Sequence, residues 1–100
     1  MIKDKALIEF MRTLNCSCRS KECVGQVVGH HIYSRGSGGP DLTDNLLPLC
    51  VFHHAQVHNI GLESFVDRNN LKLIMFSKNW EYSDNTGWVN YELKRIIHAK

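Results

Sequence analysis

The chain has 100 residues, a formal net charge of +2 at pH 7 and four cysteines. This length suits one domain with a single core, and the small positive charge neither requires nor excludes DNA as a partner. The sequence contains no apolar run that would span a bilayer and no signal-peptide pattern. We therefore expect a cytosolic protein whose cysteines bind zinc rather than form disulfides.

The first half of the chain alternates short predicted elements with irregular segments. Apolar residues recur at helical spacing over residues 4–14, which predicts an amphipathic helix. This periodicity stops in the cysteine-containing segment 16–23. The β-branched pair that opens segment 27–32 predicts a short strand. Glycines make segment 36–40 a flexible loop, and the following segment, 41–49, is short and turn-like.

The second half is richer in apolar residues. Residues 51–58 predict about two helical turns, and residues 62–66 predict a further short helix. The run 71–80 is ambiguous, because its pattern fits either a helix or a buried strand. A turn is expected at 84–87, followed by a last helix over 89–97. Together these elements predict one α+β domain.

Cys50 and His53 have the spacing Cys-x2-His, which brings two ligands from one tight turn to a tetrahedral zinc ion. Two more ligands are needed, and Cys16, Cys18 and Cys23 lie upstream. We favour Cys16 with Cys23 and leave Cys18 as a spectator or a substitute. The alternative is that these are buried free thiols, which three thiols within eight positions disfavour. We expect this zinc to stabilise the fold and to take no part in chemistry.

A second group consists of histidines. His54 and His58 are four residues apart, so on a helix they lie on one face, and His30 lies on a predicted strand. Three imidazoles leave coordination positions open, as a catalytic metal requires. His31 points away from its neighbour and suits the role of general base at neutral pH, held in one tautomer by an amide such as Asn45. Metal, base and orienting amide together fit hydrolysis of a phosphodiester.

The ordered set His30-His31, Asn45 and His54 resembles the signature of the HNH endonucleases, which have a ββα-metal fold. The longer form HH…N…HHxxxH is similar to that of the colicin-type toxin DNases. The phrase DNLLPLC-x2-HH and the surrounding cysteines also resemble small HNH proteins coded by phages and prophages. The resemblance covers roughly residues 16–60, and the segment CSCRSKEC departs from the usual Cys-x2-Cys.

The resemblance also implies a role for each position. His31 would be the general base, and Asn45 would fix the loop and orient His31. A catalytic divalent metal (Mg, Mn, Ni or Zn) and a structural zinc would be bound. Their ligands would be His30, His54 and His58 for the catalytic ion, and Cys23, Cys50, His53 and either Cys16 or Cys18 for the zinc.

We therefore expect a metal-dependent endonuclease acting on DNA, built as one HNH domain (residues 1–100) with a flanking N-terminal helix and C-terminal helices. The alternative is a zinc-stabilised DNA-binding or phage assembly module without catalysis. An HNH site contacts the phosphate backbone, so little sequence preference is expected, with weak binding at physiological salt. The resemblance alone adds phage packaging or recombination proteins as partners in the host cytosol.

Overall fold

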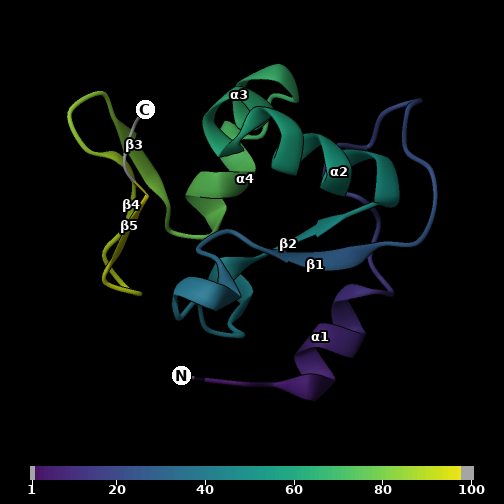
Figure 1. Cartoon of the computed structure of the whole chain (residues 1–100), viewed down its shortest axis with the longest axis horizontal. Coiled ribbons are helices and arrows are strands. Elements are labelled where there is room, and N and C mark those ends of the chain that lie inside the picture. Colours follow the sequence, from purple (N-terminus) through teal and green to yellow (C-terminus); the bar gives the residue numbers. More distant parts are fainter. Residues whose placement is uncertain (1, 98–100) are drawn as a thin grey trace.

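The computed structural model of the chain describes residues 2–97 and shows a mixed arrangement of helices and sheets (Figure 1). The expected α+β class is therefore confirmed. Within the described residues, no helix is long and apolar enough to cross a membrane. In chain order the helices and strands are α1 (Lys5–Met11), β1 (Val28–His31), β2 (Leu46–Leu49), α2 (Val51–Ile60), α3 (Leu62–Arg68), α4 (Lys72–Ser77), β3 (Glu81–Ser83), β4 (Gly87–Asn90) and β5 (Arg95–Ile97).

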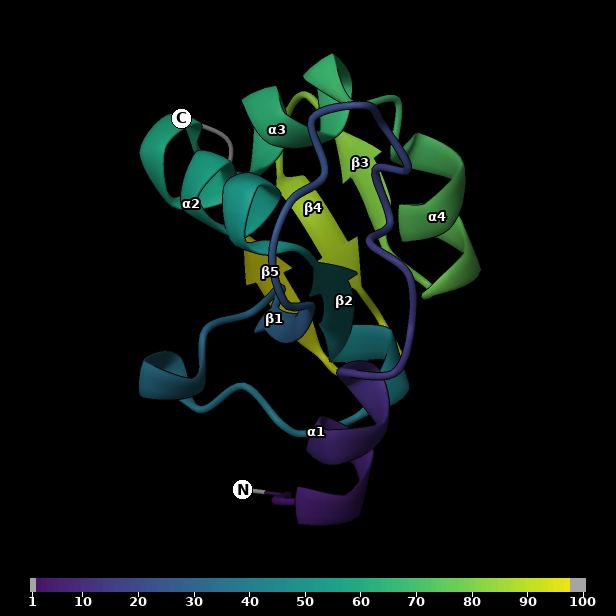
Figure 2. The same ribbon diagram turned by 90° about the vertical axis from the view of Figure 1, so that its right-hand side faces the viewer.

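The centre of the molecule is a ribbon of two antiparallel strands, β1 and β2, with His30 opposite Leu47 and His31 opposite Leu46. Helix α1 lies below this ribbon, and α2 and α3 lie above it (Figures 1 and 2). Because helices cover both faces, the leucines of β2 are completely buried. A Cβ at Gly29 would approach the Met11 side chain to 3.2 Å, so the glycine lets α1 pack closely against β1.

Helix α2 begins immediately after β2, with Cys50 as its N-cap, and ends at Gly61, which has a φ of 84°. The left-handed region that glycine adopts freely allows the chain to turn there into α3. The expected helix over 51–58 is thus confirmed, and so is the short helix that follows. This strand–strand–helix order places the end of β1 beside α2.

The C-terminal part supports the loop that precedes β2. Trp80 is fully buried, and its Nε1–H donates to the backbone oxygen of Asp44 at 2.6 Å. Lys78 Nζ donates to the Thr43 oxygen at 3.0 Å. Within the ambiguous run 71–80, residues 72–77 form helix α4. Its burial has a helical period, because Leu71 and Met75 are buried four residues apart while Leu73 and Phe76 are exposed.

The expected last helix over 89–97 is wrong, because these residues form β4, a turn and β5 in a three-stranded antiparallel sheet with the order β3-β4-β5. Asn90 accounts for much of the difference. Its Oδ1 accepts from the backbone N–H of Leu93 at 2.9 Å, and its Nδ2 donates to the Lys78 oxygen at 3.0 Å. Lys94 then takes a positive φ of 56°, which reverses the chain where a helix would continue. The expected turn at 84–87 is confirmed.

Candidate metal centres

Four predicted zinc ligands meet in one place: Cys16, Cys23, Cys50 and His53 form a group, here called the Cys3His cluster, whose ligand atoms all lie within 4.8 Å of one another. The cluster joins the loop after α1 to the first turn of α2. Cys16, Cys50 and His53 are buried, with His53 completely inaccessible to solvent. The cluster is therefore closed to substrates.

The distances within the Cys3His cluster match a tetrahedral ion. From Nδ1 of His53, the three sulfur atoms lie at 3.7 Å (Cys16), 3.7 Å (Cys23) and 3.2 Å (Cys50). Zinc–sulfur and zinc–nitrogen bonds of about 2.3 and 2.0 Å at tetrahedral angles give a sulfur–nitrogen separation of roughly 3.6 Å. A closed set of four such ligands is typical of a structural zinc site.

The structure places Cys16 in this cluster, and Cys18 stands outside the group of four. Burial raises the pKa of the Cys16 thiol, and burial also raises the pKa of Cys18. Burial acts on Cys50 too, but hydrogen bonds from the backbone of His53 and Val24 and from the His53 side chain outweigh it and lower the pKa to about 6. Cys50 is thus the thiol best prepared to act as a thiolate ligand.

Ser20 is a supporting residue that the sequence analysis missed. Its Oγ lies 3.4 Å from Nε2 of His53, the ring nitrogen that faces away from the cluster, and its backbone N–H donates to Cys23 Sγ at 3.4 Å. Such outer contacts fix the orientation of a metal ligand. The only signal in the sequence was the position of Ser20 between Cys16 and Cys23, the two cluster ligands of the loop.

The three predicted histidine ligands also come together: His30 from β1 and His54 and His58 from α2 form the three-His cluster. Their ring centroids are 5.2, 5.2 and 4.8 Å apart, and Nε2 of His54 lies 3.2 Å from Nε2 of His58. Two nitrogens bound to one tetrahedral zinc would be roughly 3.4 Å apart. The geometry therefore fits a cation held by three ligands.

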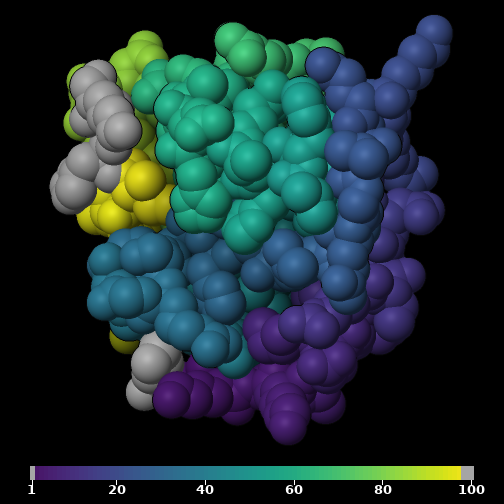
Figure 3. Space-filling view, turned by 45° about the vertical axis from the view of Figure 1, so that its right-hand side comes forward, coloured from purple at the N-terminus to yellow at the C-terminus, as the bar shows by residue number. Residues whose placement is uncertain are grey.

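This second cluster is open. His30 and His54 are half-buried and His58 is exposed, so a fourth ligand can approach from solvent. Burial, followed by repulsion from the neighbouring histidines, lowers the pKa of His30 to about 4. Burial and His58 also lower the pKa of His54. Both shifts favour the neutral imidazole, which is the form that binds a metal. In Figure 3, α2 (teal) lies directly against the blue segment that contains β1.

Asn45, the predicted orienting amide, is completely buried and fixes the loop between β1 and β2. Its Oδ1 accepts from the backbone N–H of Tyr33 at 2.7 Å, and its Nδ2 donates to the oxygens of Tyr33 and Pro40 at 3.0 Å. All three side-chain contacts are thus with backbone. The side chain that hydrogen-bonds to His31 is instead Asp41, with Oδ1 lying 2.7 Å from Nε2 of His31.

Asp41 is a second residue at the candidate site that sequence reasoning missed. It is only 3 % exposed and also contacts Arg35, whose Nη2 donates to both carboxylate oxygens at 2.8 and 3.0 Å. The opposite charges of Arg35 and Asp41 on the two sides of the glycine-rich loop were the available signal. Nothing in the sequence showed that the loop would return its carboxylate to the end of β1.

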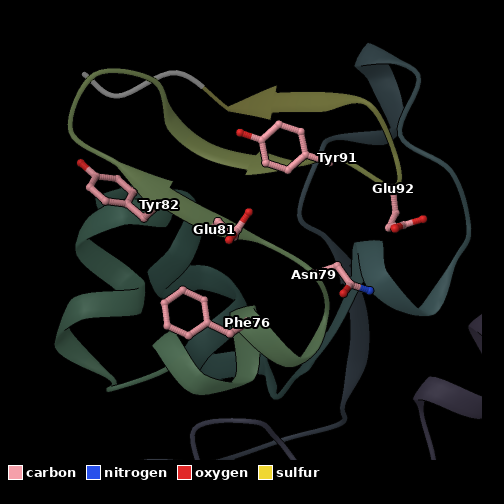
Figure 4. A pocket seen from close by; sticks show the side chains of 6 residues that line it. All are labelled: Phe76, Asn79, Glu81, Tyr82, Tyr91 and Glu92. Carbon is pink, nitrogen blue, oxygen red and sulfur yellow. The ribbon is translucent and has the colours of Figure 1, made fainter.

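A separate cavity of about 500 Å³ lies between α4 and the C-terminal sheet (Figure 4). No predicted site residue lines it; its walls are formed by Phe76, Asn79, Glu81, Tyr82, Tyr91 and Glu92. The two tryptophans, Trp80 and Trp88, are buried and belong to the core, as expected for aromatics in amphipathic segments.

Comparison of the chain with protein-family models, with curated proteins and with solved structures gives no match.

Proposed function

We propose that the chain is a metal-dependent endonuclease that hydrolyses phosphodiester bonds in DNA at the three-His cluster. The observation that carries this proposal is the open cluster on β1 and α2, with the imidazole of His31 following directly in the same strand. Three neutral ligands and an accessible fourth position are the arrangement that catalytic metals use, whereas structural metals have closed sets.

The proposed mechanism gives each residue one task. A divalent cation held by His30, His54 and His58 would supply a Lewis acid that polarises the phosphoryl group and stabilises the leaving oxygen. His31 takes a proton from the attacking water. His31 follows His30 in β1 and its side chain points away from that ligand, so in this proposal it stands beside a phosphate bound to the ion and does not bind the ion itself. Asn45 holds the loop that closes this end of the ribbon.

We propose further that the chain is one HNH domain (residues 1–100) whose core motif lies in residues 16–60. Support comes from the order of the paired histidines, Asn45 and HHxxxH along the chain, and from an antiparallel strand pair followed directly by a helix. Since such a site contacts the phosphate backbone, we expect cleavage with little sequence preference and an activity that falls as the salt concentration rises. Sequencing the ends produced from a mixed DNA substrate measures this preference.

The test is cleavage of supercoiled plasmid by the purified zinc-containing chain with added Mg, Mn, Ni or Zn. His31→Ala should lower the rate by about 100-fold or more, as expected for loss of a general base, while zinc content and thermal melting stay unchanged. Asn59→Ala is the matched control, because Asn59 is an exposed residue of α2 beside a proposed ligand.

Two results would contradict the proposal: no cleavage with any of the four metals, or full activity of His31→Ala. Tight binding of DNA by a chain that cuts it with none of these metals would favour the zinc-stabilised binding module instead. The closed Cys3His cluster is complete without the three-His cluster and would serve that module equally well.

A further inference from the structure

We propose that Asp41 is a positioning residue for His31: its carboxylate holds the imidazole in the tautomer that carries hydrogen on Nε2 and leaves Nδ1 free to accept a proton. The orientation of the His31 ring follows from its contact with Asp41 and does not depend on any function. Its catalytic consequence rests on the function proposed above, and the experiment below separates the two.

The Asp41 carboxylate is buried and fully paired. Oδ1 contacts His31 Nε2 at 2.7 Å and Arg35 Nη2 at 2.8 Å, while Oδ2 accepts from Arg35 at 3.0 Å and from the backbone N–H of Asp4 at 2.9 Å. A buried carboxylate persists in the charged form only with such partners. Burial raises the pKa of Asp41, but these hydrogen bonds and the Arg35 charge outweigh it and lower the pKa to about 2.

The charge of Asp41 decides where the hydrogen of His31 lies. An ionised carboxylate only accepts hydrogen bonds, so the hydrogen between the two side chains belongs to Nε2 of His31. A neutral imidazole has one such hydrogen, and its other nitrogen then carries a free lone pair. No hydrogen bond from any described residue occupies Nδ1, so this atom keeps a lone pair that can accept a proton.

The backbone around Asp41 holds the carboxylate in place. The Asp41 N–H donates to the Ile2 oxygen at 2.9 Å, which joins the loop to the segment before α1. On the other side, Asn45 binds the Pro40 oxygen at 3.0 Å. Gly39 packs so closely on the Tyr33 oxygen that any Cβ there would clash. His31 itself is only 15 % exposed, so its ring has little freedom to turn away.

A purely structural role for Asp41, as an anchor for α1, predicts different behaviour. An anchor would affect every activity of the protein through folding, and its loss would add to the loss of His31. A positioning residue acts only through His31, so its loss should have no further effect once His31 is absent.

The experiment has two independent readouts. Long-range 15N–1H NMR spectra of the zinc-loaded chain, with His31 assigned by comparison with His31→Ala, should show the Nε2–H tautomer. In Asp41→Asn the signal should move toward a mixture of tautomers. A wild-type spectrum with the hydrogen on Nδ1 would overturn the proposal, whether or not the protein cuts DNA. An intact Nε2–H signal in a chain without nuclease activity would contradict only the proposed function.

The second readout is plasmid cleavage at saturating metal. Asp41→Asn should lower kcat by about 10–100-fold, as outer hydrogen bonds of catalytic sites do, and leave KM nearly unchanged. The same substitution in a His31→Ala background should cause no further loss. Asp4→Ala is the control for α1, because it removes the N-cap side chain of α1 but keeps the backbone N–H that binds Asp41. Equal losses from Asp41→Asn in both backgrounds would show an anchor and overturn the proposal.

Discussion

The Cys3His cluster and the three-His cluster take ligands from adjacent residues of α2, His53 and His54, but differ in ligand type, number and burial. The first has three thiols and one imidazole, all of them buried except the half-buried Cys23. The second has three imidazoles and faces solvent on one side. Soft thiolates in a closed set hold zinc for stability, whereas three imidazoles with an open position leave a metal able to react.

The comparison teaches that burial, as much as ligand identity, separates the two roles. In the Cys3His cluster an ion would cross-link the loop after α1 to the start of α2 inside the core. In the three-His cluster an ion would add to a surface that is already supported by β1 and α2. Loss of a ligand should therefore affect folding in one cluster and only metal binding in the other.

The largest expected effect is that of Cys50→Ala. This variant loses the buried thiol whose pKa lies lowest among the shifted cysteines, so zinc binding and the folding energy coupled to it should be lost. That energy is comparable with the whole stability of a small domain, about 5–15 kcal/mol. Circular dichroism melts should show no cooperative transition. A normal melt, or one unaffected by a strong chelator, would make the cysteines ordinary core residues.

A sharper version compares Cys16→Ser with Cys18→Ser. Only Cys16 belongs to the cluster, so only its replacement should lower zinc content and melting temperature strongly. The Cys18 variant should bind one zinc and melt within a few degrees of the wild type, as expected for a change of about 1 kcal/mol. A strong loss from Cys18→Ser and a weak one from Cys16→Ser would show that Cys18 is the fourth ligand.

His58→Ala tests the open cluster. Removal of a direct ligand should weaken the second, exchangeable metal by more than the roughly 100-fold that loss of an outer hydrogen bond can cause. Because His58 is exposed, the free energy of unfolding of the protein with an empty three-His cluster should change by no more than about 0.5 kcal/mol. Calorimetric titration of the zinc-loaded chain with a second metal gives the affinity. If this variant unfolds, the three-His cluster also supports the fold, and the proposed difference between the two clusters is wrong.

Ser20→Ala should have the smallest effect. It removes the hydroxyl beside Nε2 of His53 but no ligand, so zinc affinity should fall by about 10–100-fold while the domain stays folded at saturating zinc. Competition with a chromogenic chelator measures the change. Ser17→Ala is the matched control, because Ser17 lies in the same loop but bonds the Pro48 oxygen.

Local spacing was enough to predict which side chains of α2 would lie together. The i, i+4 relation of His54 and His58 and the Cys-x2-His spacing depend on one short helix, which is capped by Cys50 at its start and by Gly61 at its end. The prediction of a last helix was wrong because the apolar residues of this segment satisfy a helical period and also fit two strands joined by a turn. These residues are Val89, Leu93, Ile96 and Ile97. The hydrogen bonds of Asn90, one to Leu93 in the turn and one to the more distant Lys78, favour the strands.

The Asp41–His31 pair was beyond local prediction for a related reason. It depends on how the loop between β1 and β2 closes, and this closure comes from Asn45 binding backbone atoms on both sides of the loop. Residue type alone made Asp41 an unremarkable loop carboxylate. Only its burial against Arg35 and the first residues of the chain gives it a role.

The adjacency of His53 and His54 links the geometry of the two clusters. Successive residues of a helix are turned by about 100°, so one turn of α2 carries both clusters in a fixed relation. A newly made copy that has not yet acquired zinc lacks the support that holds this turn against the ribbon. We therefore expect a strict loading order, in which the tightly held ion comes first and the reactive one second.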